Sequence, residues 1–488
     1  MKLRHVFGCL LLALVAPAMA QDAKSVIATA STAMGLDGVN SLYYYGSGRS
    51  YSIGQNNNAN IPWPQTPLND WVRAIDFAQP AMRTTWNTYA VPVTGGAATL
   101  QKGQQNVTPA QANNWNLQLE IWTTPWGFIK GAAASGNASV KTENVGGKPY
   151  RVVTWSPATK SPGGQIYKLV GWINADNLVT KVNTWVEHNI FGDLLVESEY
   201  SFYREINGLK FPTEMVQRRA GWPVFDAQIL AAWPNPPKLA ELMAMPAAGA
   251  GGPPGGGPGG APAAAQSEKL ADGVYRIRGA YNSLAVEMAD QVLLIEPGPQ
   301  SEARALAGIA EVRRLFPGKP IKFGVITHHH FDHTGGIAAV AAEGITIVTP
   351  AVNKAFLEKA LSGPRTLAPD ALAKSGKKAV IEGFSGDKRV FQDATRTVEI
   401  HVIKGLPHAD GLVIAWLPKE KILVYADMFN FPPANEPVAN PPVIGTRVFL
   451  ENLQRLGIES DRILSIHTMN PDRLATMQDI KSSMGIAN

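Results

Sequence analysis

The sequence has little of several features that would point to common protein classes. It contains one cysteine, Cys9, in 488 residues, so a chain processed beyond that position is expected to have neither a thiol nor a disulfide. The 44 basic residues and 39 acidic residues leave a formal net charge of +5 without long basic blocks, which gives no support for nucleic-acid binding. No apolar stretch approaches the ~20 residues that a membrane span needs. These absences favour a globular protein without disulfide bonds.

The amino terminus has the pattern of a secretory signal peptide. Lys2 and Arg4 precede an apolar run from Val6 to Ala16, and Ala18-Met19-Ala20 supplies the small residues of a cleavage site before Gln21. We therefore expect residues 1–20 to be removed and the mature protein to be periplasmic or secreted.

The middle of the chain predicts a linker between two domains. Residues 246–265 are twenty consecutive Pro, Gly and Ala residues, a composition that favours an extended tether over a packed core. Because the length also exceeds what one core usually organises, we expect a domain at 21–245, a linker at 246–267 and a second domain at 268–488.

The amino-terminal half is predicted to be rich in β-strands. A helix is expected from Lys24 to Met34, ended by Gly35, and strands follow. Asn207-Gly208 lies between two strand-like stretches and predicts a tight hairpin.

A helix followed by a curved antiparallel sheet resembles the half-barrel of periplasmic lipoprotein carriers. The resemblance implies an apolar ligand on the concave face of residues 22–235. The alternative is that the aromatic residues fill the core of the sheet; eleven of the twelve tryptophans lie in this half, and aromatic side chains are good strand residues. The alternative is favoured, because aromatic residues in strands more often pack than bind.

The carboxy-terminal half contains a concentrated histidine motif. His328, His329, His330, Asp332 and His333 fall within six consecutive positions after the apolar run Phe323-Gly324-Val325-Ile326. Since residues two apart in an extended chain point the same way, His328 and His330 should share one side, and His329 should face the opposite way as a packing or supporting residue. Imidazole nitrogen and carboxylate oxygen are the ligands of catalytic zinc sites. The motif therefore predicts a metal site.

Three further candidates lie beside later strand-like stretches. His408 follows Leu406-Pro407, Asp427 ends the stretch that begins at Lys421, and His467 ends the stretch that begins at Arg462. Buried strands commonly deliver functional side chains at such ends.

The order and spacing of these pieces resemble the metallo-β-lactamase superfamily of hydrolases over about residues 268–488. The resemblance implies an αββα sandwich, giving an α+β protein with the metal site at the edge of its sheets. One metal would be held by His328, His330 and His408, and the other by Asp332, His333 and His467, with Asp427 bridging the two. Asp332 would also orient the nucleophile. Ala426 and Thr468 stand where the superfamily commonly has glycine, but neither departure removes a ligand.

The resemblance also implies a chemistry. Two zinc ions that share a hydroxide would hydrolyse a small-molecule substrate, for which we expect an ester, lactone, thioester or phosphodiester. His330 stands where the flavodiiron branch generally has glutamate, which favours zinc, although iron or manganese in one position stays open. The substrate is expected to be selected by loops such as 383–393 and 429–446.

Two alternatives remain open at this stage. One is a β-lactamase of the same fold, although those enzymes commonly use a cysteine ligand or lack the bridging carboxylate that Asp427 supplies. The other is a ligand-binding protein that acts through its aromatic amino-terminal domain.

Overall fold

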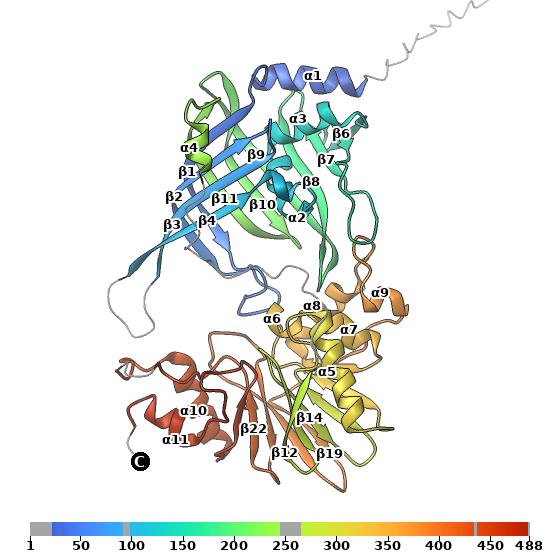
Figure 1. Ribbon diagram of the computed structural model, residues 1–488, viewed down its shortest axis with the longest axis vertical. Coiled ribbons are helices and arrows are strands. Elements are labelled where there is room, and N and C mark those ends of the chain that lie inside the picture. The colour runs from blue at the N-terminus through green and yellow to red at the C-terminus, as the bar shows by residue number, and fades with distance from the viewer. Residues whose placement is uncertain (1–21, 91–97, 245–264, 434–436, 487–488) are drawn as a thin grey trace, which may run out of the picture.

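The structure is a computed structural model that describes residues 22–90, 98–244, 265–433 and 437–486. The predicted signal peptide at 1–20 and almost all of the predicted linker lie outside these residues. The described part forms two domains, each built on its own β-sheet system (Figure 1). Within it, no helix is both long and apolar enough to span a bilayer.

The amino-terminal domain is one curved antiparallel sheet of eleven strands, as the strand pattern predicted. Their order is β4-β3-β2-β1-β11-β10-β9-β8-β7-β6-β5. The strands are β1 (Ser41–Tyr51), β2 (Gln65–Asp76), β3 (Ala81–Ala90), β4 (Thr99–Val107), β5 (Ser139–Val145), β6 (Lys148–Trp155), β7 (Leu169–Ile173), β8 (Val179–His188), β9 (Gly192–Ile206), β10 (Leu209–Arg219) and β11 (Trp222–Pro234). The helical segments are α1 (Ala23–Met34), η1 (Pro109–Gln111), α2 (Trp115–Trp122), α3 (Pro125–Ser135) and α4 (Leu239–Met243).

Local signals account for several of these boundaries. The Asp22 side chain accepts a hydrogen bond from the Lys24 amide at the start of α1, and Gly35 ends the helix at a φ of 72°. Asn207 and Gly208 both have positive φ and join β9 to β10 by a two-residue turn. Both predictions are confirmed.

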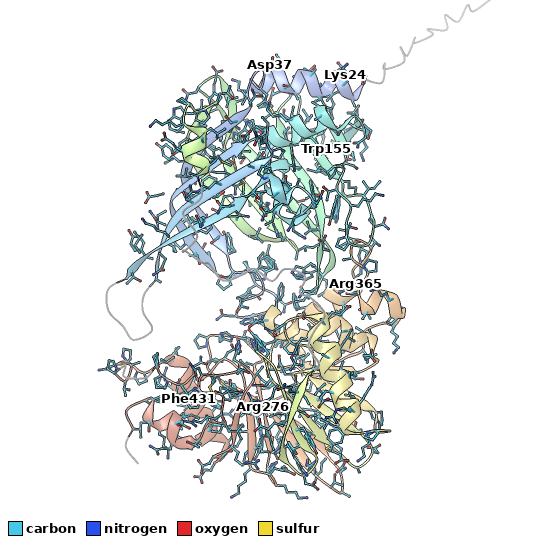
Figure 2. The ribbon with its side chains drawn as sticks, in the orientation of Figure 1. Lys24, Asp37, Trp155, Arg276, Arg365 and Phe431 are labelled. Atoms are coloured by element: carbon cyan, nitrogen blue, oxygen red, sulfur yellow. The ribbon has the colours of Figure 1, made fainter. Side chains whose placement is uncertain are left out.

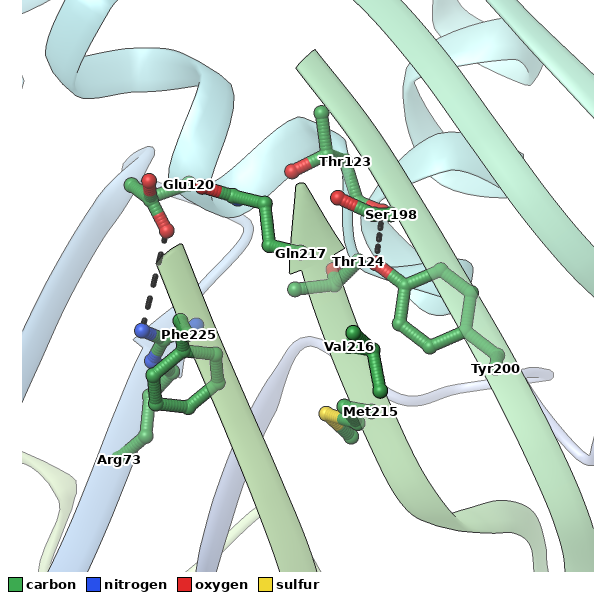
Figure 3. A pocket seen from close by; sticks show the side chains of 10 residues that line it. All are labelled: Arg73, Glu120, Thr123, Thr124, Ser198, Tyr200, Met215, Val216, Gln217 and Phe225. Atoms are coloured by element: carbon green, nitrogen blue, oxygen red, sulfur yellow. Dashed lines mark hydrogen bonds and ion pairs between the residues drawn. The ribbon is translucent and has the colours of Figure 1, made fainter. Parts of the chain in front are cut away.

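Aromatic side chains and helices fill the interior of the curved sheet. Trp126 of α3 lies 4.2 Å from Phe211 between ring centroids, and Tyr44 contacts both rings. Figure 3 shows a neighbouring cavity lined by Arg73, Glu120 and Tyr200 among others, with a volume of about 20 Å³. That volume accommodates a water molecule rather than a lipid chain. The packing favours the view that these aromatic residues build the core; the apolar ligand stays a prediction.

The carboxy-terminal domain is the αββα sandwich that the resemblance implied. A seven-stranded sheet runs β12-β13-β14-β15-β16-β17-β18, and a five-stranded sheet runs β19-β20-β21-β22-β23. The strands are β12 (Gln266–Ala271), β13 (Val274–Arg278), β14 (Ser283–Glu287), β15 (Val292–Ile295), β16 (Ile321–Val325), β17 (Thr346–Pro350), β18 (Ile381–Phe384), β19 (Lys388–Gln392), β20 (Thr397–Val402), β21 (Val413–Leu417), β22 (Ile422–Tyr425) and β23 (Ile463–Ser465). The helices are α5 (Glu302–Leu315), α6 (Phe331–Thr334), α7 (Ile337–Ala342), α8 (Ala351–Ser362), α9 (Ala371–Ser375), α10 (Ile444–Leu456) and α11 (Met477–Ser482).

Three apolar cores define the layers. Leu294 and Ile347 of the first sheet pack against Ile309 of α5, while the opposite faces of both sheets share a second core. Phe449 of α10 packs with Tyr425 on the outer side of the second sheet. Each sheet is therefore covered by helices on one face and by the other sheet on the other face.

One sequence expectation about the loops was wrong. The segment 383–393, expected as a substrate loop, is largely occupied by β18 and β19, and only a short turn joins them. Pairing of β18 with β17 and of β19 with β20 carries the chain from one sheet to the other. Pairing in the two sheets therefore determines the conformation of this segment.

The two domains contact each other directly. Asp193, at the start of β9, accepts hydrogen bonds from the amides of Thr366 and Leu367, and Arg365 donates to the carbonyls of Asn189 and Ile190. Arg365 lies at the junction between the domains (Figure 2). A second contact is made by the segment between β1 and β2, which lies against α6 (Figure 1).

Candidate metal centre

Segments that follow strands of both sheets bring all seven of the predicted ligands to one edge of the sandwich. His328 and His330 follow β16, Asp332 and His333 lie in α6, His408 lies between β20 and β21, Asp427 follows β22 and His467 follows β23. The structure brings these seven side chains into three overlapping groups, in each of which the ligand atoms lie within 4.8 Å of one another.

The first group consists of three imidazoles, His328, His330 and His408. The ring of His330 lies 4.4 Å from that of His328 and 4.5 Å from that of His408. Burial lowers the pKa of all three rings, that of His330 to about 3. They are therefore neutral near pH 7, which is the form in which imidazole coordinates a metal.

The second group consists of Asp332, His333 and His467. His333 Nε2 lies 3.2 Å from His467 Nε2 and 3.5 Å from Asp332 Oδ2. Its other nitrogen, Nδ1, donates to Glu296 Oε1 at 2.9 Å, so Nε2 is the atom that faces the group.

The carboxylates near His333 make this corner favourable for a cation. Burial lowers the pKa of His333, but Glu296 and Asp427 outweigh it and raise the pKa to about 10. Burial raises the pKa of Asp332, but His333 and hydrogen bonds from Gln55 and Tyr281 bring the net value below the usual one. Positive charge, as a proton or a metal ion, is thus stabilised here.

The third group, His328, His333 and Asp427, overlaps the first two, and Asp427 lies between them. Its Oδ2 is 3.6 Å from His328 Nε2, 3.8 Å from His408 Nε2 and 3.0 Å from His333 Nε2, while Oδ1 is 2.9 Å from His467 Nε2. Burial raises the pKa of Asp427, but the close imidazoles of His333 and His467 outweigh that effect, so the carboxyl stays ionised well below the usual pH.

Three polar atoms test whether these residues suit a metal. His328 Nε2, His408 Nε2 and Asp427 Oδ2 are buried and have no hydrogen-bond partner within the described residues. Buried polar atoms rarely go unpaired without a functional reason. Two imidazole lone pairs converging with a carboxylate oxygen fit a divalent cation that accepts nitrogen and oxygen ligands.

His329 does not join any of the three groups, in line with the expectation that it faces away. It is fully buried, and its Nε2 donates to the Asn56 carbonyl at 2.8 Å.

Sequence reasoning missed four residues at the centre. Tyr281 and Gln55 donate to the two carboxylate oxygens of Asp332, Asn56 accepts from His330, and Glu296 supports His333. Glu296 left a signal, because it is a charged residue directly after the apolar strand Val292–Ile295. Gln55 and Asn56 stand in an uninterrupted run of four amide residues, 55–58, which was the available signal for them.

Comparison with known proteins gives one family match and several similar solved structures. The family model described as the metallo-β-lactamase superfamily matches residues 276–441. Similar solved structures include the DIM-1 metallo-β-lactamase, with 17% identity over 46% of this chain and 96% of that chain at a TM-score of 0.34. A metallo-β-lactamase from Pontibacter korlensis has 17% identity over 46% of this chain and 98% of that chain at a TM-score of 0.32. TMB-1 has 16% identity over 46% of this chain and 97% of that chain at a TM-score of 0.34.

The carboxy-terminal half therefore contains a domain of the metallo-β-lactamase superfamily, matched at residues 276–441, and this membership supports a metal-dependent hydrolase.

Proposed function

We propose that this protein is an exported, dinuclear zinc hydrolase that acts on an ester, lactone, thioester or phosphodiester. The observation that carries the proposal is the position of Asp427, whose two carboxylate oxygens face imidazoles of both ligand groups. A carboxylate in that position supports a pair of metal ions rather than one.

Each ligand group would hold one ion. The group of His328, His330 and His408 would bind through nitrogen alone, and that of Asp332, His333 and His467 through nitrogen and oxygen. Five of the six are imidazoles, a set that suits zinc. Bound there, two divalent ions would supply Lewis acidity and would lower the pKa of water toward neutrality.

The protein's own contribution is to fix the ligands. Thr327 and Glu296 hold the remote nitrogens of His328 and His333, at 3.2 Å and 2.9 Å respectively. Tyr281 and Gln55 hold Asp332 through one carboxylate oxygen each, both at 2.9 Å. Partners of this kind set the orientation of the ligands and of the group that attacks the substrate.

The compartment and the substrate class rest on the sequence. The amino-terminal pattern of a signal peptide supports export, and the combination of Asp427 with the absence of cysteine beyond Cys9 favours the ester, lactone, thioester or phosphodiester classes over β-lactams.

The test is elemental analysis of the purified full chain together with a panel of ester, lactone, thioester, phosphodiester and β-lactam substrates. We expect about two zinc ions per chain and turnover that is lost on chelation and restored by zinc. Asp427→Asn should lower turnover by a hundredfold or more, on the order of 3 kcal/mol. His401→Gln is the matched control, since His401 pairs with Glu399 away from the metal centre. This variant should hydrolyse the substrate at the wild-type rate.

Less than one zinc ion per chain after reconstitution, with no turnover, would overturn the proposal. Turnover of β-lactams alone would keep the metal centre and replace the substrate class.

A further inference from the structure

Residues 52–64 form a loop between β1 and β2 of the amino-terminal domain, which we call the amide loop. The two ends of the loop are joined by a hydrogen bond of 2.9 Å from the Ser52 amide to the Pro64 carbonyl. The loop is rich in amide side chains, with Gln55 and four asparagines within six positions. It lies against α6 and the histidine motif of the other domain (Figure 1).

Asn56 of the amino-terminal domain contacts the predicted ligand His330 of the carboxy-terminal domain. Its carbonyl oxygen lies 3.0 Å from His330 Nε2 and 2.8 Å from His329 Nε2. A carbonyl only accepts, so His330 must carry its proton on Nε2, and Nδ1 is left as the nitrogen with a free lone pair. The contact therefore selects the tautomer and the ring orientation in which His330 can coordinate.

The carbonyl of Asn56 is itself fixed by its own side chain. Asn56 is 2% exposed, and its Nδ2 donates to the carbonyls of Asn58 at 2.6 Å and Ile61 at 2.9 Å. These two bonds fold the loop around the buried residue. Loss of the amide would free the backbone at the point where it meets the histidines.

Gln55 holds a ligand of the other group. Its Nε2 donates to Asp332 Oδ1 at 2.9 Å, and the two residues are 277 positions apart in the chain. Because Tyr281 already holds Oδ2, Gln55 is the second of two donors that determine how the carboxylate is rotated. Consecutive residues of one loop thus reach the two different ligand groups.

The rest of the loop is anchored on both ligand-bearing segments. Gly54 packs against the ring of Phe331, so closely that a Cβ at this position would lie 2.2 Å from the ring. Trp63 meets the same ring edge to face, at 6.4 Å. On the other side, Asn58 Nδ2 donates to Asp410 Oδ2 at 3.0 Å, and Asn57 donates to the Pro407 carbonyl, directly before His408.

We infer that the amino-terminal domain completes the metal centre, with Asn56 as the positioning residue for the three-histidine group and Gln55 as the positioning residue for the group that contains Asp332. This inference rests on the proposed function, because it assigns the two residues to ligands of the proposed ions. It gives the amino-terminal domain a part in positioning the metal ligands, and that part needs no ligand bound to the amino-terminal domain itself.

The experiment measures zinc binding to the full chain by competition with a chelator, and uses cadmium NMR to tell which of the two groups has lost its ion. Asn56→Ala should weaken binding at the three-histidine group by about tenfold to a hundredfold, the usual effect of removing a partner of a metal ligand. Gln55→Leu should weaken the Asp332 group by a similar factor and leave the other group unchanged. Asn60→Ala is the matched control, an exposed asparagine of the same loop that contacts neither group.

The pattern across the two groups decides the inference. Wild-type binding at both groups in both variants would overturn it while leaving the proposed function intact. Equal weakening of both groups by either variant would also overturn it, since general loosening of the domain contact predicts that result. If Asn56→Ala does not fold, the partly exposed Gln55 still gives the selective test. A wild-type chain that binds no zinc would overturn the proposed function and the inference together.

Discussion

The hydroxyl of Tyr281 donates to Asp332 Oδ2 at 2.9 Å, and the ring of Tyr281 lies 4.3 Å from the ring of His467. The same ring lies 5.4 Å from the ring of His333, so one side chain contacts all three members of the second ligand group. Burial, followed by the charge of Asp332, raises the pKa of Tyr281 above its usual value, so the hydroxyl remains a donor throughout the neutral range.

Replacing this hydroxyl should affect turnover more than folding. Tyr281→Phe keeps the ring against His467 and removes the donor to Asp332, so we expect kcat/KM to fall about tenfold, which corresponds to ~1.4 kcal/mol. Steady-state kinetics and thermal unfolding measure the two effects. Tyr281→Ala is the comparison, because it also removes the ring; equal losses in the two variants would assign the effect to packing rather than to the hydroxyl.

Glu296 should control the affinity of the second group. Its side chain is fully buried, and it accepts from His333 Nδ1 at 2.9 Å and from the Thr327 amide at 3.0 Å. Glu296→Gln removes the charge that polarises His333, so zinc affinity at that group should fall about tenfold to a hundredfold. Zinc titration measures this. Glu343→Gln, at a surface ion pair with Arg313, should bind zinc as the wild type does.

The contact at Asp193 should contribute to the stability of the whole chain. Its carboxylate accepts from the Thr366 amide at 2.9 Å, the Thr366 hydroxyl at 2.7 Å and the Leu367 amide at 2.9 Å. Asp193→Ala leaves these donors without their charged partner and should lower the free energy of unfolding by about 2 kcal/mol. Denaturant unfolding measures the change. An unchanged midpoint would mean that the domains are held mainly through the amide loop.

His188 should make stability depend on pH. Burial, with smaller contributions from Arg219 and Arg365, lowers its pKa from 6.5 to about 4. Between these values the unfolded chain binds a proton that the folded chain does not, so this contribution to stability is constant above pH 6.5 and is lost as the pH falls toward 4. At pH 5 the loss is at most about 2 kcal/mol.

The check is a difference between two proteins, because other groups also titrate in this range. In the wild type the amides of Ile190 and Phe191 donate hydrogen bonds to His188 Nδ1 at 3.1 Å and 3.3 Å. His188→Asn keeps a side-chain acceptor for these two amides. We expect the variant to lose less stability than the wild type between pH 7 and pH 5. An equal loss in the free energy of unfolding for the variant and the wild type between the two pH values would contradict the assignment.

The features that could be predicted from sequence are those with short-range signals. The first helix, the Asn207-Gly208 turn and the run of histidines each combine a residue type with a local spacing, and the structure places the seven predicted ligands together. Their role as ligands stays a prediction until zinc binding is measured. Strand ends made the distant ligands visible as well, because a polar residue after an apolar run stands out.

The remaining features depend on contacts between distant segments. Gln55 carries no local sign that it will meet Asp332, since that contact joins two domains and spans 277 positions of the chain. The strands at 381–384 and 388–392 could not be predicted from their own sequence for a related reason. Their conformation depends on pairing with β17 and β20. Such outcomes are properties of the assembled fold rather than of any window of sequence.

The anchoring of the amide loop on Phe331 limits how this protein can change over evolution. A linker of proline, glycine and alanine looks like a place where one domain could be exchanged for another. Here a replacement domain would have to bring a backbone carbonyl to the same point beside His330 and an amide beside Asp332, and would have to cover the same aromatic ring. The two halves are therefore expected to be inherited together, and changes in the amide loop should be matched by changes in the histidine motif.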